Sequence, residues 1–207
     1  MTKQVNRREP LRERILTAAE SRIVSGGVSA LRARDVMAEA GAALGGLYNA
    51  FADLDDVVLH VNSRTLARLR ADLADASAGF EEPGAALRAL ALAYLDFAQR
   101  NRTLWQALFE YRYASGREMP DWHLAEQAEL LTHIADPLRM LRPDWSPETL
   151  LVRARTLFGA IHGIVSTSME ERFVGLSGES RSLEIGEFVD VIVAGTRLEK
   201  RSSSPAR

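Results

Sequence analysis

The chain has 207 residues, of which 46% are apolar and 26% charged, and a formal net charge of −2. This length suits one or two folded domains, and the abundance of Ala, Leu, Arg and Glu favours helix. The absence of cysteine excludes disulfides, thiolate metal sites and cysteine nucleophiles. No apolar run approaches the ~20 residues of a membrane span, and the polar N-terminus has no signal-peptide core, so we expect a cytoplasmic protein without membrane contact.

The first helix signals lie near the N-terminus. Pro10 and the Gly26-Gly27 pair are the expected start and end of one helix, and its apolar face carries Leu11, Ile15, Ala18, Ala19 and Ile23. A two-turn helix is predicted over 33–40, stopping at Gly41. The apolar segment 44–51 follows almost at once.

A long helix is predicted over 53–80, with Asp53 as its N-cap. Further helices are expected over 81–101, 102–116, 120–141, 146–173 and 183–200, separated by loops such as 174–182. Ser146 is the expected cap of the helix that has Pro147 at its first position. The prediction is an all-α fold of about nine helices, with an N-terminal three-helix domain over 1–52 and a helical bundle for ligand binding and dimerisation over 53–207.

Charge is distributed unevenly. Through residue 34 there are eight basic and three acidic side chains, a local excess of +5. Such an excess attracts a polyanion even when the whole protein is acidic. Taken alone, a solvated basic tail is the better interpretation.

Residues 33–51 have the spacing of a helix-turn-helix. Gly41 would supply a left-handed turn residue, and 44–51 would be the recognition helix, lying in a DNA major groove by its N-terminal residues. Gly45 and Gly46 fall in its first turn, where a bare backbone and free N–H groups suit a phosphate. A connector helix with two glycines for tight packing explains the same pattern.

These residues also carry a resemblance. An Ile-Leu-x-Ala-Ala helix, then Arg-Asp-hydrophobic with Ala-Gly, then Gly-x-Leu-Tyr-x-x-Phe resembles the N-terminal domain of TetR-family transcriptional regulators. The matching positions are Ile15, Leu16, Ala18, Ala19, Arg34, Asp35, Val36, Ala40, Gly41, Gly45, Leu47, Tyr48 and Phe51. The resemblance implies an all-helical homodimer that represses transcription and is released by a small ligand. Residues 145–166 resemble a C-terminal domain type named for Trp, His and Gly, where His162 and Gly163 match and Phe158 replaces the Trp.

The chain departs from this family pattern where Ser, Lys, Thr or His is often found. These positions hold Ala43, Leu44, Gly46 and Ala50, which removes several side-chain phosphate donors. Tyr48 is suited to a phosphate and Asn49 to an adenine edge, whereas Ala42, Ala43 and Leu44 suit thymine methyls. The predicted DNA-binding residues are Arg7, Arg8, Arg32, Arg34, Ala42, Ala43, Leu44, Gly45, Gly46, Tyr48 and Asn49, with Leu47 and Phe51 in the core.

The middle of the chain is rich in aromatic residues. Apolar cavities between helices are natural ligand sites, and the resemblance implies an inducer here, of a small apolar or aromatic class. The predicted pocket residues are Tyr94, Trp105, Phe109, Trp122, Phe158 and His162. For any one of them, a core position is the alternative.

The last two long helices have broad apolar faces. A face wider than one neighbour can cover indicates a partner, so we expect a two-fold, four-helix interface between two subunits. The predicted interface residues are Leu150, Leu157, Ile161, Phe188, Val189 and Ile192. Two recognition helices would then meet successive major grooves of a palindromic duplex, about 34–36 Å apart or a multiple of that distance.

Catalysis is the class that the motifs disfavour. His123, Glu126, Glu129 and His133 suggest a metal site, but the last three lie opposite an apolar side formed by Leu124, Leu131, Ile134, Leu138 and Leu141, which predicts a solvated face. No phosphate loop, nucleophile elbow or zinc motif occurs, so we expect no enzyme, cofactor or metal. The open alternative is a helical dimer that senses a ligand or binds a protein, with weak or no specific DNA binding.

Overall fold

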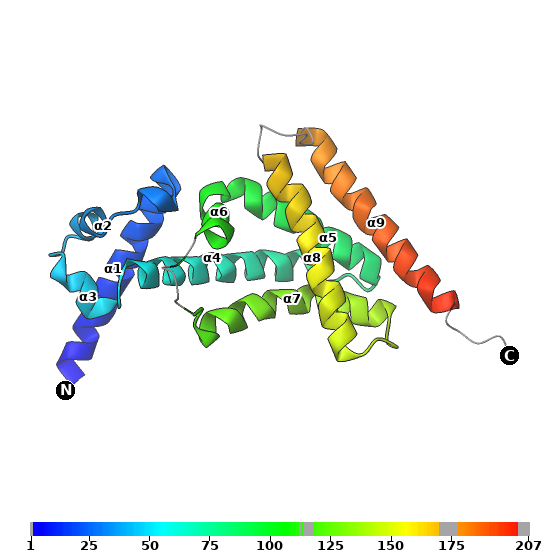
Figure 1. Cartoon of the computed structure of the whole chain (residues 1–207), viewed down its shortest axis with the longest axis horizontal. Helices are drawn as coiled ribbons and strands as arrows, with labels where there is room; N and C mark the ends of the chain where they lie inside the picture. The colour runs from blue at the N-terminus through cyan, green and yellow to red at the C-terminus, as the bar shows by residue number, and fades with distance from the viewer. Residues whose placement is uncertain (1, 112, 114–117, 170–177, 203–207) are drawn as a thin grey trace. The chain divides into compact units, whose positions relative to one another are not determined.

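The computed structural model describes residues 2–111, 113, 118–169 and 178–202. Over these residues the chain forms nine α-helices, one short 3-10 helix and no strand (Figure 1), which confirms the all-α prediction. The elements in order are α1 (Thr2–Gly26), the 3-10 helix Val28–Ala30, α2 (Ala33–Glu39), α3 (Gly45–Ala50), α4 (Leu54–Ser77), α5 (Pro83–Arg100), α6 (Arg102–Glu110), α7 (Asp121–Leu141), α8 (Pro147–Met169) and α9 (Gly178–Ser202). Among the described helices, none has both the length and the apolarity that crossing a bilayer needs.

The chain divides into two compact units. The first is drawn from residues 1–68 and 101–124, and the second from 69–100 and 125–207. The first unit therefore contains α6 and the first half of α4 in addition to α1, α2 and α3. The boundary between a DNA-binding domain over 1–52 and a ligand-binding and dimerisation domain over 53–207 stays a prediction.

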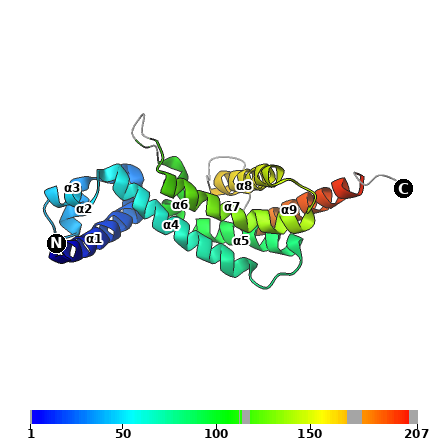
Figure 2. The same cartoon turned by 90° about the horizontal axis from the view of Figure 1, so that it is seen from below.

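In the first unit, α1 packs against α2 and α3 (Figure 2) and also against α6. The predicted apolar face of α1 is its core face, because Ile15, Ala19 and Ile23 are fully buried and Leu11 packs partly buried beside them. Pro10 lies inside α1 and does not begin it. The φ of proline suits a helix, but proline removes one backbone hydrogen bond and its ring crowds the carbonyl four residues earlier, which is a cost that α1 bears at Pro10.

Local cap signals are confirmed at three places. Gly41 has φ +63°, the left-handed conformation that the turn requires. The Asp56 N–H donates to Asp53 Oδ1 at 2.8 Å, so Asp53 caps α4. At the start of α8, the Thr149 N–H donates to Ser146 Oγ at 3.1 Å.

In the second unit, α5 packs against α8 and α9. Helices α5 and α9 approach each other closely at two glycines. A Cβ at Gly84 would lie 3.0 Å from Val193 Cγ1, and a Cβ at Gly186 would lie 2.5 Å from the Arg88 guanidinium. Helix α9 begins at Gly178, so the predicted loop 174–182 is wrong over its last five residues; residues 174–177 lie outside the described part.

Helix α7 differs most from its predicted orientation. His123 is buried, with 2% of its surface exposed, whereas Leu124 is 47% exposed. His123 lies eighteen residues before the buried Leu141, which is five turns of 3.6 residues, so the two residues share one face of the helix. Leucines spaced by seven residues drift off such a face.

The expected solvated face of α7 is consequently wrong in part. Glu129 is exposed and pairs with Arg70. Glu126 and His133 are half-buried, and burial lowers the pKa of His133.

The cap of α4 yields a stability prediction. Asp53→Ala removes the oxygen that accepts the Asp56 N–H, so the free energy of unfolding should fall by about 1 kcal/mol in urea denaturation. Asp53→Asn keeps a capping oxygen and should stay within about 0.5 kcal/mol of the wild type. Equal losses in both variants would contradict the cap.

Candidate nucleic-acid interface

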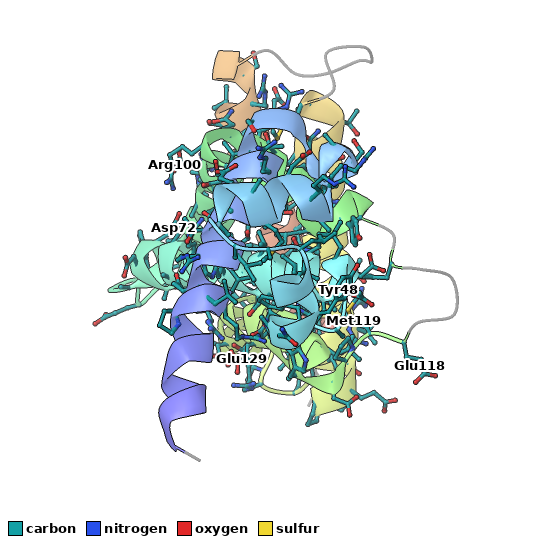
Figure 3. All side chains as sticks on the ribbon, turned by 90° about the vertical axis from the view of Figure 1, so that its left-hand side faces the viewer. Tyr48, Asp72, Arg100, Glu118, Met119 and Glu129 are labelled. Carbon is teal, nitrogen blue, oxygen red and sulfur yellow. The ribbon has the colours of Figure 1, made fainter. Side chains whose placement is uncertain are left out.

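Helix α3 has one face in the core and one in solvent. Leu47 and Phe51 are buried, 0% and 3% exposed, as predicted. Tyr48 lies at the surface with 62% of its area exposed (Figure 3), and Asn49 is exposed beside it. Tyr48 is therefore a surface side chain, and its aromatic ring is available together with its hydroxyl.

The turn before α3 is held from α1 by Arg14. Its Nε and Nη2 donate to the Ala40 carbonyl at 2.9 and 2.6 Å, and Nη2 also donates to the Gly41 carbonyl at 3.2 Å. The last carbonyls of a helix have no partner within the helix. Arg14 satisfies the carbonyls of the two residues that directly follow α2, and so fixes the turn that leads to α3.

The two adjacent glycines of α3 differ in their surroundings. A Cβ at Gly46 would lie 3.2 Å from Met37 Cε and 3.6 Å from Leu11 Cδ2, whereas one at Gly45 would meet nothing within 4 Å. Packing inside the protein therefore explains Gly46, and an open surface surrounds Gly45.

The expectation of free N–H groups in the first turn of α3 is corrected as well. The Gly46 N–H donates to the Ala43 carbonyl at 2.8 Å, and the Leu47 N–H donates to the Leu44 carbonyl at 3.1 Å. Tight turns of this kind engage N–H groups that an ideal helix would leave open.

Several basic side chains of the N-terminal segment have partners inside the protein. Arg22 pairs with Glu39 at 2.6 Å and lies 4.0 Å from Asp35, and its hydrogen bond lowers the pKa of Glu39. The Arg32 Nη1 donates to the carbonyls of Ser29 and Leu31 at 2.9 and 2.8 Å. The excess of +5 therefore overstates the charge available to a partner.

Arg34 is the contrasting case. It is exposed, and it makes no ion pair with the side chains that the structure describes. Ala43, Leu44 and Gly45 are also exposed, while Ala42 packs partly buried against the core. The backbones of Arg7 and Arg8 lie in α1; their side chains lie outside the described residues.

Five of the six predicted pocket residues fall into two groups. In the second unit, the Tyr94 hydroxyl and His162 Nδ1 are hydrogen-bonded at 2.8 Å, and Phe158 stacks on the imidazole with ring centroids 5.8 Å apart. Burial lowers the pKa of His162, which favours the neutral ring. In the first unit, Trp105 is buried beside Phe109 at 5.4 Å.

Trp122 packs against His60 of α4, a residue that was not among the predicted pocket residues. It stacks on His60, with centroids 5.0 Å apart and planes 13° apart. It is 39% exposed.

The predicted interface residues lie mostly inside the subunit. Leu150, Leu157, Ile161 and Val189 are buried, and Phe188 and Ile192 are half-buried. The large apolar side chains that the described parts of the same two helices expose are Leu151, Val152, Leu183, Val191 and Leu198. The interface itself stays a prediction.

Asn62 is a buried polar residue that the sequence analysis did not single out. It is 1% exposed, and its Nδ2 donates to the Ala107 carbonyl at 3.4 Å and to the Tyr113 hydroxyl at 3.3 Å. The spacing of Val58, Asn62 and Leu66 along α4 was the signal that places it on the core face. Among the described side chains, no three carboxylate or imidazole groups gather as a metal would need.

Comparisons with known proteins can now be set beside this geometry. A family model described as the tetracyclin repressor-like C-terminal domain matches residues 87–190, and no curated protein matches the chain. A protein of unknown function from Rhodococcus sp. RHA1 is 22% identical, with a TM-score of 0.69 over 91% of this chain and 94% of its own. A protein described as a TetR-family transcriptional regulator from Rhodococcus sp. is 21% identical, with a TM-score of 0.68 over 88% and 98%. RolR, solved in complex with resorcinol, is 13% identical, with a TM-score of 0.67 over 98% and 97%.

At these identities the solved structures show a shared fold. An all-α chain that combines a helix-turn-helix pair with a C-terminal helical domain is the architecture of a class of transcriptional regulators. This chain belongs to the TetR family, the tetracycline-repressor-like regulators, because the family model matches half of it. The matched range also contains the segment that resembled a Trp-His-Gly type domain.

The two glycines of α3 give a matched pair of variants. Gly45→Ala adds a methyl in open space and improves helix propensity, so it should leave unfolding stability unchanged or raise it by up to about 1 kcal/mol. Gly46→Ala adds the same methyl against the buried Met37, so it should be less stable than Gly45→Ala by about 1 kcal/mol. Urea denaturation of both variants checks this, and equal stabilities would show that Gly46 is not required by packing.

Proposed function

We propose that this protein is a cytoplasmic transcriptional repressor that binds a palindromic duplex as a homodimer and is released by a small apolar or aromatic ligand. The observation that supports DNA binding is the division of α3 into two faces. Leu47 and Phe51 anchor the helix in the core, while Tyr48 stands 62% exposed on the other side. A short helix that is anchored on one face and presents polar groups on the other is what a major groove accepts.

Each exposed group then has a role set by its chemistry. Arg34 and the Tyr48 hydroxyl meet phosphates, which sets register on the duplex. The Asn49 amide is able to read an adenine edge, and Leu44, 41% exposed, meets a thymine methyl. Arg32 contributes less than Arg34, because its guanidinium is folded back onto backbone carbonyls.

Dimerisation is proposed on the outward faces of α8 and α9. Leu183, Val191 and Leu198 are each more than half exposed and recur along one side of α9. On α8, Gly159 and Gly163 are exposed, and a Cβ at either would meet nothing within 4 Å, so a second subunit could approach this helix closely. Two copies of this pair of helices would form the two-fold, four-helix interface.

The ligand class follows from aromatic side chains within each unit. Tyr94, Phe158 and His162 form one cluster and Trp105 with Phe109 another. Such groups favour flat, apolar or aromatic molecules. RolR, a structural neighbour, was solved with resorcinol, a ligand of this class.

A second candidate function is a ligand-sensing or protein-binding dimer without specific DNA binding. One observation favours it: Ala43, Leu44, Gly46 and Ala50 offer no side-chain phosphate donor. The DNA experiment below separates the two functions.

The DNA prediction uses a duplex selected from a random-sequence pool by the wild-type protein. Arg34→Ala and Tyr48→Phe should each weaken binding, and in Arg34→Ala the plot of log affinity against log salt should become shallower by about one, because one phosphate is no longer neutralised. Arg139→Ala is the control, since Arg139 is 62% exposed on α7 and pairs with Asp136; its affinity and slope should equal those of the wild type. Failure to select any duplex would favour the second candidate.

The dimer prediction uses Val191→Asp, which places a charge in the proposed apolar interface. Burying an unpaired carboxylate costs several kcal/mol, so the dimer dissociation constant in analytical ultracentrifugation should rise by at least about a hundredfold. Val24→Asp on α1, where Val24 is 54% exposed, is the matched control and should leave association unchanged. A dimer insensitive to Val191→Asp would place the interface elsewhere.

A further inference from the structure

Helix α3 has six residues, too few to be stable by itself in water. Its orientation therefore depends on the groups that hold its two ends. The N-terminal end follows the turn fixed by Arg14. The C-terminal end is held by a second arginine of α1, Arg12.

Arg12 contacts the end of α3 in two ways. Its Nη1 donates to the carbonyl of Ala50, the last residue of the helix. Its Cζ lies 4.1 Å from the centroid of the Phe51 ring, within the range of a cation–π contact. A cation at this end also opposes the partial negative charge of the last carbonyls.

The other nitrogen of the same guanidinium reaches α4. Arg12 Nη2 lies 3.1 Å from His60 Nε2. A guanidinium has only donors, so Nε2 accepts, and the proton of a neutral ring is on Nδ1. His60 also lies edge-on to Phe51 at 5.5 Å and stacks on Trp122.

Asp56 closes the cluster on the α4 side. Its Oδ1 lies 3.6 Å from His60 Nε2, and its Oδ2 accepts the Ala52 N–H at 3.0 Å. One side chain of α1 therefore joins the end of α3, the connection to α4 and the second turn of α4.

We propose that Arg12 is a positioning residue for DNA binding. By fixing the end of α3 to His60, it holds Tyr48 and Asn49 in the orientation that the duplex requires, so that less ordering is needed on binding. This inference rests on the proposed function, but the positioning role can be disproved by results that still support DNA binding.

Arg12 differs from a phosphate ligand in where its donors point. Its guanidinium is engaged by the Ala50 carbonyl, by His60 and by the Phe51 ring, whereas Arg34 is exposed. Removing a cation that binds a phosphate reduces the salt dependence of binding. Removing a positioning residue weakens binding at every salt concentration and leaves that slope unchanged.

The test compares Arg12→Met with Arg34→Ala on the duplex selected by the wild type. Methionine keeps an apolar stem over Phe51 and helix propensity but removes the donors. Affinity should fall by at least about tenfold, the size expected when a charge-assisted hydrogen bond is removed, with the wild-type salt slope. In Arg34→Ala the slope should become shallower by about one.

A second pair of variants tests the same link without changing Arg12. In His60→Gln the amide oxygen takes the place of Nε2 and accepts from Arg12, so affinity should stay within about threefold of the wild type. His60→Leu removes the acceptor and should lose about as much affinity as Arg12→Met.

Three results would overturn the proposal. These are an unchanged affinity in Arg12→Met, a shallower slope in that variant like the one in Arg34→Ala, or equal affinities in the two His60 variants. In each of these cases, binding of the selected duplex by the wild-type protein would still support the proposed function. If the wild type selects no duplex, the proposed function fails, and the positioning role fails with it.

Discussion

The first unit depends on how a six-residue helix is held in place. Leu47 and Phe51 supply the apolar anchor, and both are buried. Two arginines of α1 supply the polar anchors, Arg14 at the carbonyls before the turn and Arg12 at the carbonyl that ends α3. Because a helix this short cannot hold its own conformation, the exposed side chains on its other face have a defined direction only as long as these contacts persist.

This arrangement changes the meaning of the basic N-terminal segment. Counted along the sequence, its arginines suggest a surface that attracts a polyanion. In the folded chain, Arg12 and Arg14 donate to carbonyls, Arg22 pairs with Glu39, and Arg32 donates to the carbonyls of Ser29 and Leu31. The charge that organises the helix-turn-helix pair and the charge available to DNA are thus carried by different residues, with Arg34 in the second group.

In the second unit, the packing of α5 against α9 decides which faces remain outside. Gly84 and Gly186 allow the two helices to approach closely, and Val189 is buried. Helix α9 is apolar on more than one side, so burying one side leaves Val191 and Leu198 in solvent. The sequence predicted a broad apolar surface on this helix, but the side that a neighbour of the same chain covers could not be known before α5 was in place.

The sequence by itself determined the features that depend on near neighbours along the chain. These are the nine helices of the described part of the chain, the left-handed turn at Gly41, the caps at Asp53 and Ser146, and the core face of α1, because propensity, capping and helical periodicity act within a few residues. Only the tertiary structure decided that Gly46 faces Met37, that Arg12 reaches His60, and that His123 and not Leu124 is buried. Such contacts join residues far apart in the chain, and their partners are set by how whole helices pack.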